Sequence, residues 1–125
     1  MSEYQNKAVE LMRNRIGENA LNNTIERREA FLRKALTLYH AMGGTAEGLQ
    51  AAVKDAVSTP APSIDVAVGD VMYKLAAIGH VADIDIMQAG YNKLDAANLH
   101  ILSKGKKLLQ KQRDKKLSAA AMPIK

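Results

Sequence analysis

The chain has 125 residues, of which 47% are hydrophobic and 25% are charged, a composition typical of one globular domain and too apolar for a disordered chain. It contains no cysteine, which excludes disulfides, thiolate metal sites and cysteine nucleophiles. The net charge of +5 is unevenly spread, because residues 1–103 carry ten Lys and Arg against twelve Asp and Glu, whereas residues 104–125 carry eight against one. The excess of positive charge therefore belongs to the C-terminal end.

Apolar residues recur at helical spacing along most of the chain, and the alternation typical of strands is almost absent, so the sequence predicts an all-α fold. A first helix is expected over about residues 3–17, where Gly17 is expected to end it. Residues 22–24 (Asn, Asn, Thr) offer an N-cap for the second helix, and Glu26 lies at the capping-box spacing from the second of them. The glycine pair 43–44 is expected to end or kink this helix.

The second half of the chain continues the helical pattern. A shorter third helix is expected over about residues 45–57, followed by a linker at residues 58–63, where each proline disfavours helical geometry at the residue before it. The fourth helix is expected over about residues 64–82. The turn at residues 82–85 then leads to a fifth helix, which Asp83 is expected to cap.

Together these elements predict a bundle of four to five helices over residues 1–103, long enough for one compact core, with a basic extension at residues 104–125. The long apolar faces favour a homo-oligomer, either a dimer or a tetramer. The N-terminus lacks the basic flank and apolar core of a secretion signal, and no apolar run reaches the roughly 20 residues of a membrane span. We therefore expect a cytoplasmic protein without a membrane segment.

Asp70 stands within the apolar run GDVMYKLAAIG, on a helix face that is expected to be buried, where a carboxylate is costly unless a cation or a donor meets it. On the preceding helix, Glu47 and Gln50 lie one turn apart. Two neighbouring helices that carry inward oxygens at this spacing can hold a hard cation such as Mg²⁺. Two simpler interpretations remain open: Glu47 interacts with the helix dipole, and Asp70 pairs with Lys74 at i+4.

The order of the motifs resembles one known family. An EYQ-like N-terminus, a His-Ala-x-x-Gly turn, a helix that opens with Glu, a proline-containing linker, GDVMYKLA and an Ile-Asp turn are similar to the MazG-like, all-α nucleotide pyrophosphohydrolases. The similarity covers about residues 3–102. The segment NKLDAANLH, residues 92–100, is similar to the phosphoribosyl-ATP pyrophosphohydrolase-like branch.

This resemblance implies a Mg²⁺ site of four carboxylates, Glu-x-x-Glu on one helix and Glu-x-x-Asp on the next, which cleaves a nucleoside triphosphate into monophosphate and pyrophosphate. In this chain the four positions hold Glu47, Gln50, Ala67 and Asp70, so two of the four carboxylates are missing and the charge falls from −4 to −2. The resemblance assigns Glu47 and Asp70 as catalytic, and these two with Gln50 as metal ligands. Asp65 cannot replace a ligand at Ala67, because it points roughly 200° away on a helix.

The resemblance also implies substrate contacts. Lys93 and Asn98 are candidates for phosphate binding and Tyr73 for a nucleotide base, although an exposed helical face explains the first two and core packing explains Tyr73. The basic residues 104–116 are either a solvated, flexible tail or a contact for the phosphate backbone of a nucleic acid. Because this segment lacks aromatic residues, sequence-specific binding is not expected.

Three hypotheses about function remain at this stage. The protein is a divergent, Mg²⁺-dependent pyrophosphohydrolase of a (deoxy)nucleoside triphosphate or a related nucleotide. Alternatively, it is a catalytically inactive scaffold of the same type that binds a nucleotide, a nucleic acid or a protein. The third hypothesis is a purely structural helical oligomer.

Overall fold

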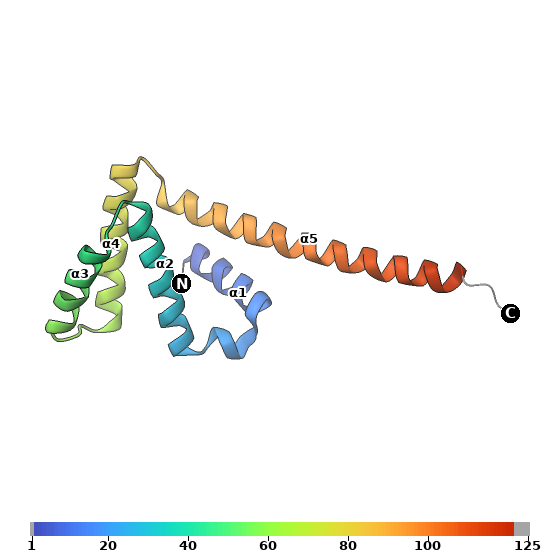
Figure 1. The fold of residues 1–125 in the computed structure, drawn as a ribbon, viewed down its shortest axis with the longest axis horizontal. Helices are drawn as coiled ribbons and strands as arrows, with labels where there is room; N and C mark the ends of the chain where they lie inside the picture. The colour runs from blue at the N-terminus through green and yellow to red at the C-terminus, as the bar shows by residue number, and fades with distance from the viewer. Residues whose placement is uncertain (1, 122–125) are drawn as a thin grey trace. The chain divides into compact units, whose positions relative to one another are not determined.

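The computed structural model describes the backbone of residues 2–121 and the side chains of residues 2–99 and 104–115. Within this part of the chain all regular structure is helical, which confirms the predicted all-α fold (Figure 1). The five helices are α1 (Glu3–Leu21), α2 (Thr24–Ala41), α3 (Ala46–Ser58), α4 (Ile64–Ala82) and α5 (Ile86–Ala121). None of the described helices is long and apolar enough to span a membrane.

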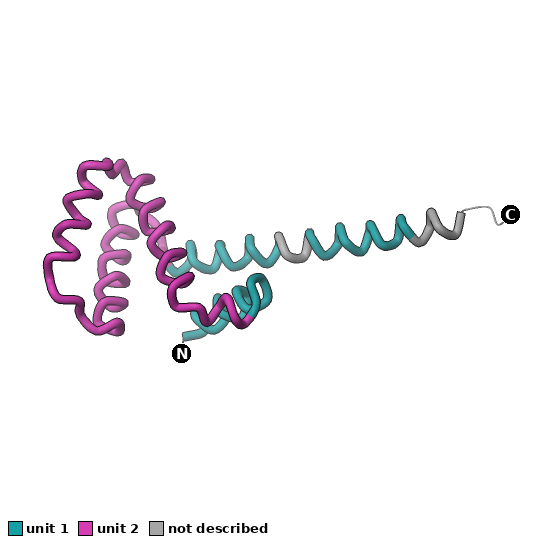
Figure 2. Tube along the Cα trace, turned by 60° about the horizontal axis from the view of Figure 1, so that its bottom comes forward, with its two compact units in different colours: residues 1–17, 87–125 teal, residues 18–86 magenta. Residues whose placement is uncertain are grey.

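The helices belong to two compact units, which are coloured separately in Figure 2. Unit 1 comprises residues 1–17 and 87–125, and unit 2 comprises residues 18–86. The predicted division at residue 104 falls inside α5 and stays a prediction.

Unit 1 is organised by aromatic contacts between α1 and the first half of α5. The rings of Tyr4 and Tyr91 meet edge to face, with centroids 5.4 Å apart. Gly90 allows this approach, because a Cβ atom at position 90 would lie 2.7 Å from Cε2 of Tyr4. Nearby on α5, Ala97 is only 7% exposed.

Unit 2 contains α2, α3 and α4, which run up, down and up in succession (Figure 1). The caps that begin α2 and α3 form as local chemistry predicts. The Asn23 side chain accepts a hydrogen bond from the N–H of Glu26 at 3.1 Å, and the Thr45 hydroxyl accepts one from the N–H of Gly48 at 3.1 Å. Gly44 and Gly48 leave the space that the Tyr39 ring occupies.

Two helix ends share one geometry. At the end of α2, Gly43 has a φ of 86°, and the N–H groups of residues 43 and 44 donate to the carbonyls of His40 and Tyr39. At the end of α4, Asp83 has a φ of 55° and takes the position that Gly43 takes in α2. Both ends are therefore Schellman motifs. The prediction that Asp83 caps the fifth helix is wrong, because the residue ends α4 and α5 begins only at Ile86.

Gly17 ends the first helical segment of the chain, as predicted, with φ 83° and ψ 166°, a conformation essentially confined to glycine. Beyond this kink a short second segment of α1 continues to Leu21. The last helix is longer than expected. At the other end of the chain α5 continues through Gly105 to Ala121, so the basic segment is helical there rather than a flexible tail. Its abundance of Lys, Leu and Gln favours the helix.

The expectation of one compact core is wrong for the single chain. Among the residues that the structure describes, Ala97 is the one hydrophobic residue that is buried. In unit 2, sixteen large apolar side chains are between 36% and 80% exposed. The helices thus form as predicted, while most of their apolar surface stays uncovered.

Candidate functional site

The predicted metal ligands lie on the hairpin formed by α3 and α4. Glu47 is in the first turn of α3 and Gln50 is one turn later, while Ala67 and Asp70 occupy the first half of α4. The two helices run in opposite directions and are joined by residues 59–63 (Figure 1). The fold therefore brings both halves of the predicted motif to one hairpin.

The register of the hairpin can be counted from its linker. Asp70 lies six residues after the first residue of α4, and Gln50 lies eight residues before the last residue of α3. At 1.5 Å per residue, these two positions differ in height by roughly 3 Å, whereas Glu47 and Asp70 differ by roughly 7–8 Å. By this count, the neutral Gln50 is nearer in height to Asp70 than the charged Glu47 is.

The environment of these residues is a poor match for a cation site. Glu47, Gln50 and Asp70 are all exposed. The described residues include no group of three or more His, Cys, Asp or Glu that could hold a metal ion. Magnesium loses its bound water only at a high energetic cost. Two exposed carboxylates on separate helices do little to offset this cost.

Asp70 does not occupy the buried face that the apolar run suggested. On α4 it lies about 150° around the helix axis from the stripe formed by Val68, Val71, Met72 and Leu75. No ion pair joins Asp70 to Lys74 among the described contacts, and the Lys74 ammonium lies 5.6 Å from the centroid of the Tyr73 ring instead. Both interpretations of Asp70 drawn from spacing, a buried position and an i+4 pair, are therefore wrong.

Lys54 is a feature of this hairpin that the sequence interpretation missed. It lies four residues after Gln50 and seven after Glu47 on α3, so all three side chains project within about 60° of each other around the axis. The i+4 and i+7 spacings were visible in the sequence. This ammonium group partly offsets the charge of Glu47 and weakens the attraction of the hairpin for a divalent cation.

The predicted substrate contacts do not lie together on one unit. Tyr73 is on α4 in unit 2 and is 75% exposed, so the interpretation of this residue as core is wrong. Lys93 and Asn98 are on α5 in unit 1. Asn98 lines a cavity there, and Lys93 does not.

That cavity, of about 350 Å³, lies between α1 and α5 within unit 1. Its polar lining includes Lys7, Glu10, Asn14, Tyr91, Asp95 and Asn98. The Lys7 ammonium lies 2.9 Å from Oε1 of Glu3, and the hydrogen bond and charge of this carboxylate raise the pKa of Lys7. With two carboxylates in the lining and its one lysine already paired, the cavity is unsuited to a nucleotide phosphate.

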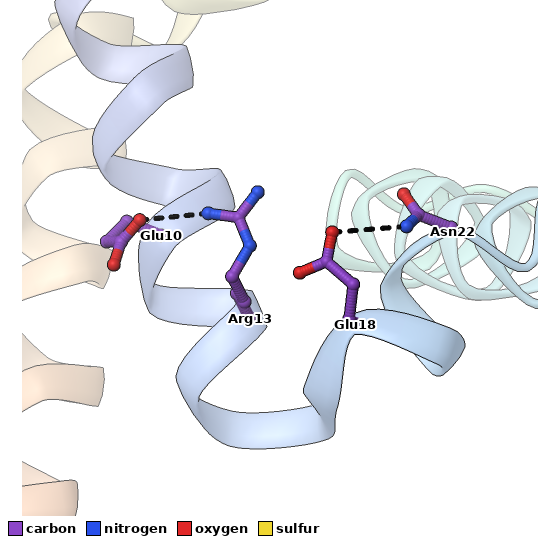
Figure 3. A network of polar contacts seen from close by, with 4 residues as sticks. All are labelled: Glu10, Arg13, Glu18 and Asn22. Carbon is purple, nitrogen blue, oxygen red and sulfur yellow. Dashed lines mark hydrogen bonds and ion pairs between the residues drawn. The ribbon is translucent and has the colours of Figure 1, made fainter.

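Two further polar contacts, in α1 and just after it, are local surface pairs. Arg13 Nη1 donates to Glu10 Oε2 at 2.9 Å, and, beyond Gly17, Asn22 Nδ2 donates to Glu18 Oε1 at 3.3 Å (Figure 3). These are i,i+3 and i,i+4 contacts of exposed side chains, which stabilise a helix only weakly.

The chain matches no family model, no curated protein and no solved structure. The likeness to the MazG-like pyrophosphohydrolases therefore remains a resemblance of motifs, and the site residues drawn from it remain predictions.

Proposed function

We propose that the protein is a non-catalytic helical scaffold, of the type its motifs resemble, which binds a polyanion, most simply a nucleic acid, through the basic part of α5. The observation that carries the proposal is a row of four exposed lysines on one face of this helix. The α3–α4 hairpin supports the absence of catalysis, because it combines two exposed carboxylates with a glutamine, an alanine and a lysine.

The lysine row follows the helical repeat. Its members are Lys104, Lys107, Lys111 and Lys115, at spacings of three, four and four residues, and all four are exposed. They span about 16 Å along the helix axis, a length over which duplex DNA presents several phosphates. Asp114 is the acidic residue of this segment, and its carboxylate accepts a hydrogen bond from Gln110 at 3.0 Å.

Salt-dependent binding tests this proposal. Binding of a fluorescent DNA duplex and of a single strand is measured by anisotropy at several salt concentrations. For the triple variant Lys104→Gln, Lys107→Gln, Lys111→Gln, we expect the slope of log affinity against log salt to become shallower by roughly 2–3, since each neutralised phosphate contributes about 0.7–0.9.

A matched control removes the same charge elsewhere. The exposed Lys34, Lys54 and Lys74 belong to unit 2, and their triple substitution by Gln should leave the slope nearly unchanged. Equal losses in the two triple variants would show that net charge rather than the α5 row is responsible. Absence of salt-sensitive binding by the unmodified chain would reject the proposal.

A second candidate function is a weak Mg²⁺-dependent nucleotide pyrophosphohydrolase. The α3–α4 hairpin favours it, because Glu47, Gln50 and Asp70 stand on two consecutive helices and carry the side-chain oxygens that Mg²⁺ prefers. Magnesium would be held by these three residues, by water and by the substrate phosphates, and would neutralise charge on the reacting phosphate.

Restoration of the two missing carboxylates tests this candidate. We expect Gln50→Glu with Ala67→Glu to create Mg²⁺-dependent pyrophosphate release from a panel of nucleoside triphosphates if the mapping is right. The pair Gln50→Glu with Ala67→Gln is the control for size, because it adds a side chain of similar volume at the half-buried Ala67 without the second charge. If the unmodified chain hydrolyses a nucleotide and Asp70→Ala does not, the protein is an enzyme and the scaffold proposal is rejected.

A further inference from the structure

The basic end of α5 carries positive charge on two opposite sides. Residues 104–115 include six Lys and Arg against one Asp, and all of them except Gly105 are exposed. The lysine row described above occupies one side of the helix. Lys106 and Arg113 do not belong to this row, and at about 100° per residue they project roughly 155° away from its centre. The lysine row is therefore only half of the cationic surface.

A face without charge separates the two cationic sides, and we call it the neutral face. Leu108 and Leu109 are 61% and 57% exposed and project about 50° to either side of its centre, close to which Gln112 lies. Gly105 begins this face, and a Cβ atom there would meet nothing within 4 Å. The lysine row lies roughly 100° to one side of the neutral face, and Lys106 and Arg113 lie roughly 100° to the other.

The acidic residue of this segment lies on the fourth side of the helix. Asp114 projects about 170° from the centre of the neutral face. Gln110, which donates to the Asp114 carboxylate at 3.0 Å, projects about 150° from it. A polyanion that approached from this side would meet a like charge, whereas the neutral face has cations on both of its flanks.

This distribution of charge matches the major groove of a DNA duplex. The groove is about 12 Å wide and admits an α-helix, whose diameter with side chains is about 10–12 Å. The phosphates of the two strands line its two edges. A helix that lies in the groove with its neutral face toward the bases directs one cationic side to each strand and keeps its acidic side in solvent. A flat anionic surface would engage only one cationic side.

We infer that the basic end of α5 lies in the major groove of B-form DNA, with its neutral face toward the base edges and its two cationic sides on the phosphates of the two strands. The inference rests on the proposed function and narrows its polyanion to a DNA duplex. The A-form groove of double-stranded RNA is too deep and narrow for a helix. Residues 104–115 include no aromatic ring on which the bases of a single strand would stack.

Two glutamines of the same helix give a matched test. Gln112 lies on the neutral face and Gln110 lies on the acidic side, and both are exposed. Each is changed to Glu, and duplex binding is measured by anisotropy, with circular dichroism as a check that both variants stay helical. Gln112→Glu should weaken binding on the order of 10-fold or more, because its carboxylate would lie between two rows of phosphates. Gln110→Glu should change the affinity by less than about 3-fold, because its carboxylate stays in solvent.

The second cationic side is tested separately. For Lys106→Gln with Arg113→Gln, we expect the slope of log affinity against log salt for the duplex to become shallower by roughly 2, since both residues would neutralise phosphates. The control pair Lys34→Gln with Lys54→Gln removes the same charge from unit 2 and should leave the slope nearly unchanged.

A modified duplex tests the groove itself. Thymine carries its methyl group in the major groove, so a bulky group in place of this methyl fills the groove and leaves the phosphates unchanged. Binding of the unmodified chain to such a duplex should be weaker on the order of 10-fold than to the ordinary duplex. Binding to a single strand with the same substitution should change little.

The outcomes distinguish this inference from the proposed function. Equal losses of duplex affinity in Gln110→Glu and Gln112→Glu, or tight binding to the modified duplex, would overturn the groove and leave nucleic-acid binding intact. Equal affinity for double-stranded RNA or for a single strand would do the same. Absence of salt-sensitive binding to any nucleic acid, with binding to vesicles of an anionic phospholipid instead, would reject both.

Discussion

Glycine has opposite effects at different positions of this chain. Gly43 has a φ of 86° at the end of α2, where an L side chain is strained. Gly105 lies inside α5 with ordinary helical geometry, and a Cβ atom there would meet nothing within 4 Å. The same substitution should therefore destabilise one site and stabilise the other.

We expect Gly43→Ala to lower the free energy of unfolding by about 1–2 kcal/mol, the cost of a left-handed residue with a Cβ atom. We expect Gly105→Ala to favour the helical state of α5 by about 0.8–1 kcal/mol. Urea unfolding followed by circular dichroism checks the first value. For the second, the helical circular dichroism signal of Gly105→Ala is compared with that of the unmodified chain before and after mild heating. A loss of helical signal in Gly105→Ala would contradict the helical assignment of the basic segment.

The start of α4 makes the stability of the chain sensitive to pH. The Ser63 hydroxyl and the N–H of Val66 donate to the Asp65 carboxylate and lower its pKa below the ordinary value of 3.8. A carboxylate with a lowered pKa in the folded state stabilises that state above its ordinary pKa, and the contribution is lost as the pH falls through the folded value. Ser63 thus supports α4 through Asp65, since it makes no side-chain cap bond itself.

Ser63→Ala should raise the pKa of Asp65 toward 3.8 and lower the melting temperature at neutral pH. Ser63→Ala and the unmodified chain should converge in stability as the pH falls below the pKa that Asp65 has in the folded state, because Asp65 is then protonated in both. Melting curves between pH 2 and pH 7 check this, with an NMR titration of Asp65 as the direct readout. An equal difference in stability at every pH would show that the Ser63–Asp65 hydrogen bond is not the cause.

At the scale of the helices, local signals in the sequence predicted most of the structure. The start of α2 at Asn23, the break at Gly17 and the bounds of α4 all depend on residues within a few positions of each other, and cap and turn chemistry describes such neighbours well. Asp83 was misread because aspartate serves both as an N-cap and as a left-handed residue, and only the φ of 55° distinguishes the two roles.

The two roles of Asp83 lead to opposite predictions for one substitution. Glycine adopts the left-handed conformation without cost, so Asp83→Gly should raise the free energy of unfolding by about 0.5–1 kcal/mol if the residue ends α4. If Asp83 were instead the N-cap of α5, the loss of its carboxylate would lower stability. Urea unfolding checks the sign, with Asp83→Val, which should be destabilising in the left-handed position, as the opposite control.

The candidate site was less predictable than the fold. The sequence correctly assigned Glu47, Gln50 and Asp70 to consecutive helices, because this follows from their positions along the chain. It could not show how the two helices are rotated relative to each other, because the spacing of residues along one helix sets only the faces of that helix. Nor could spacing distinguish a buried Asp70 from an exposed one, because α4 carries apolar residues around most of its circumference.

At the scale of the whole molecule, the apolar pattern predicted which side chains need to be buried. It did not predict which surface buries them. An amphipathic helix has the same sequence pattern whether its apolar face packs on its own chain or on another one. The sixteen exposed side chains of unit 2 show only that α2, α3 and α4 do not bury them among themselves.

If a second copy provides the cover, folding and association are one process, and stability must depend on protein concentration. Raising the concentration 100-fold should then raise the melting temperature by roughly 5 °C, from the mass-action gain of about 2.7 kcal/mol and the unfolding entropy of two chains of this length. Scanning calorimetry or circular dichroism at about 1 and 100 μM checks this shift. A melting temperature of the unmodified chain that does not vary with concentration would mean that its helices are held together by the single chain.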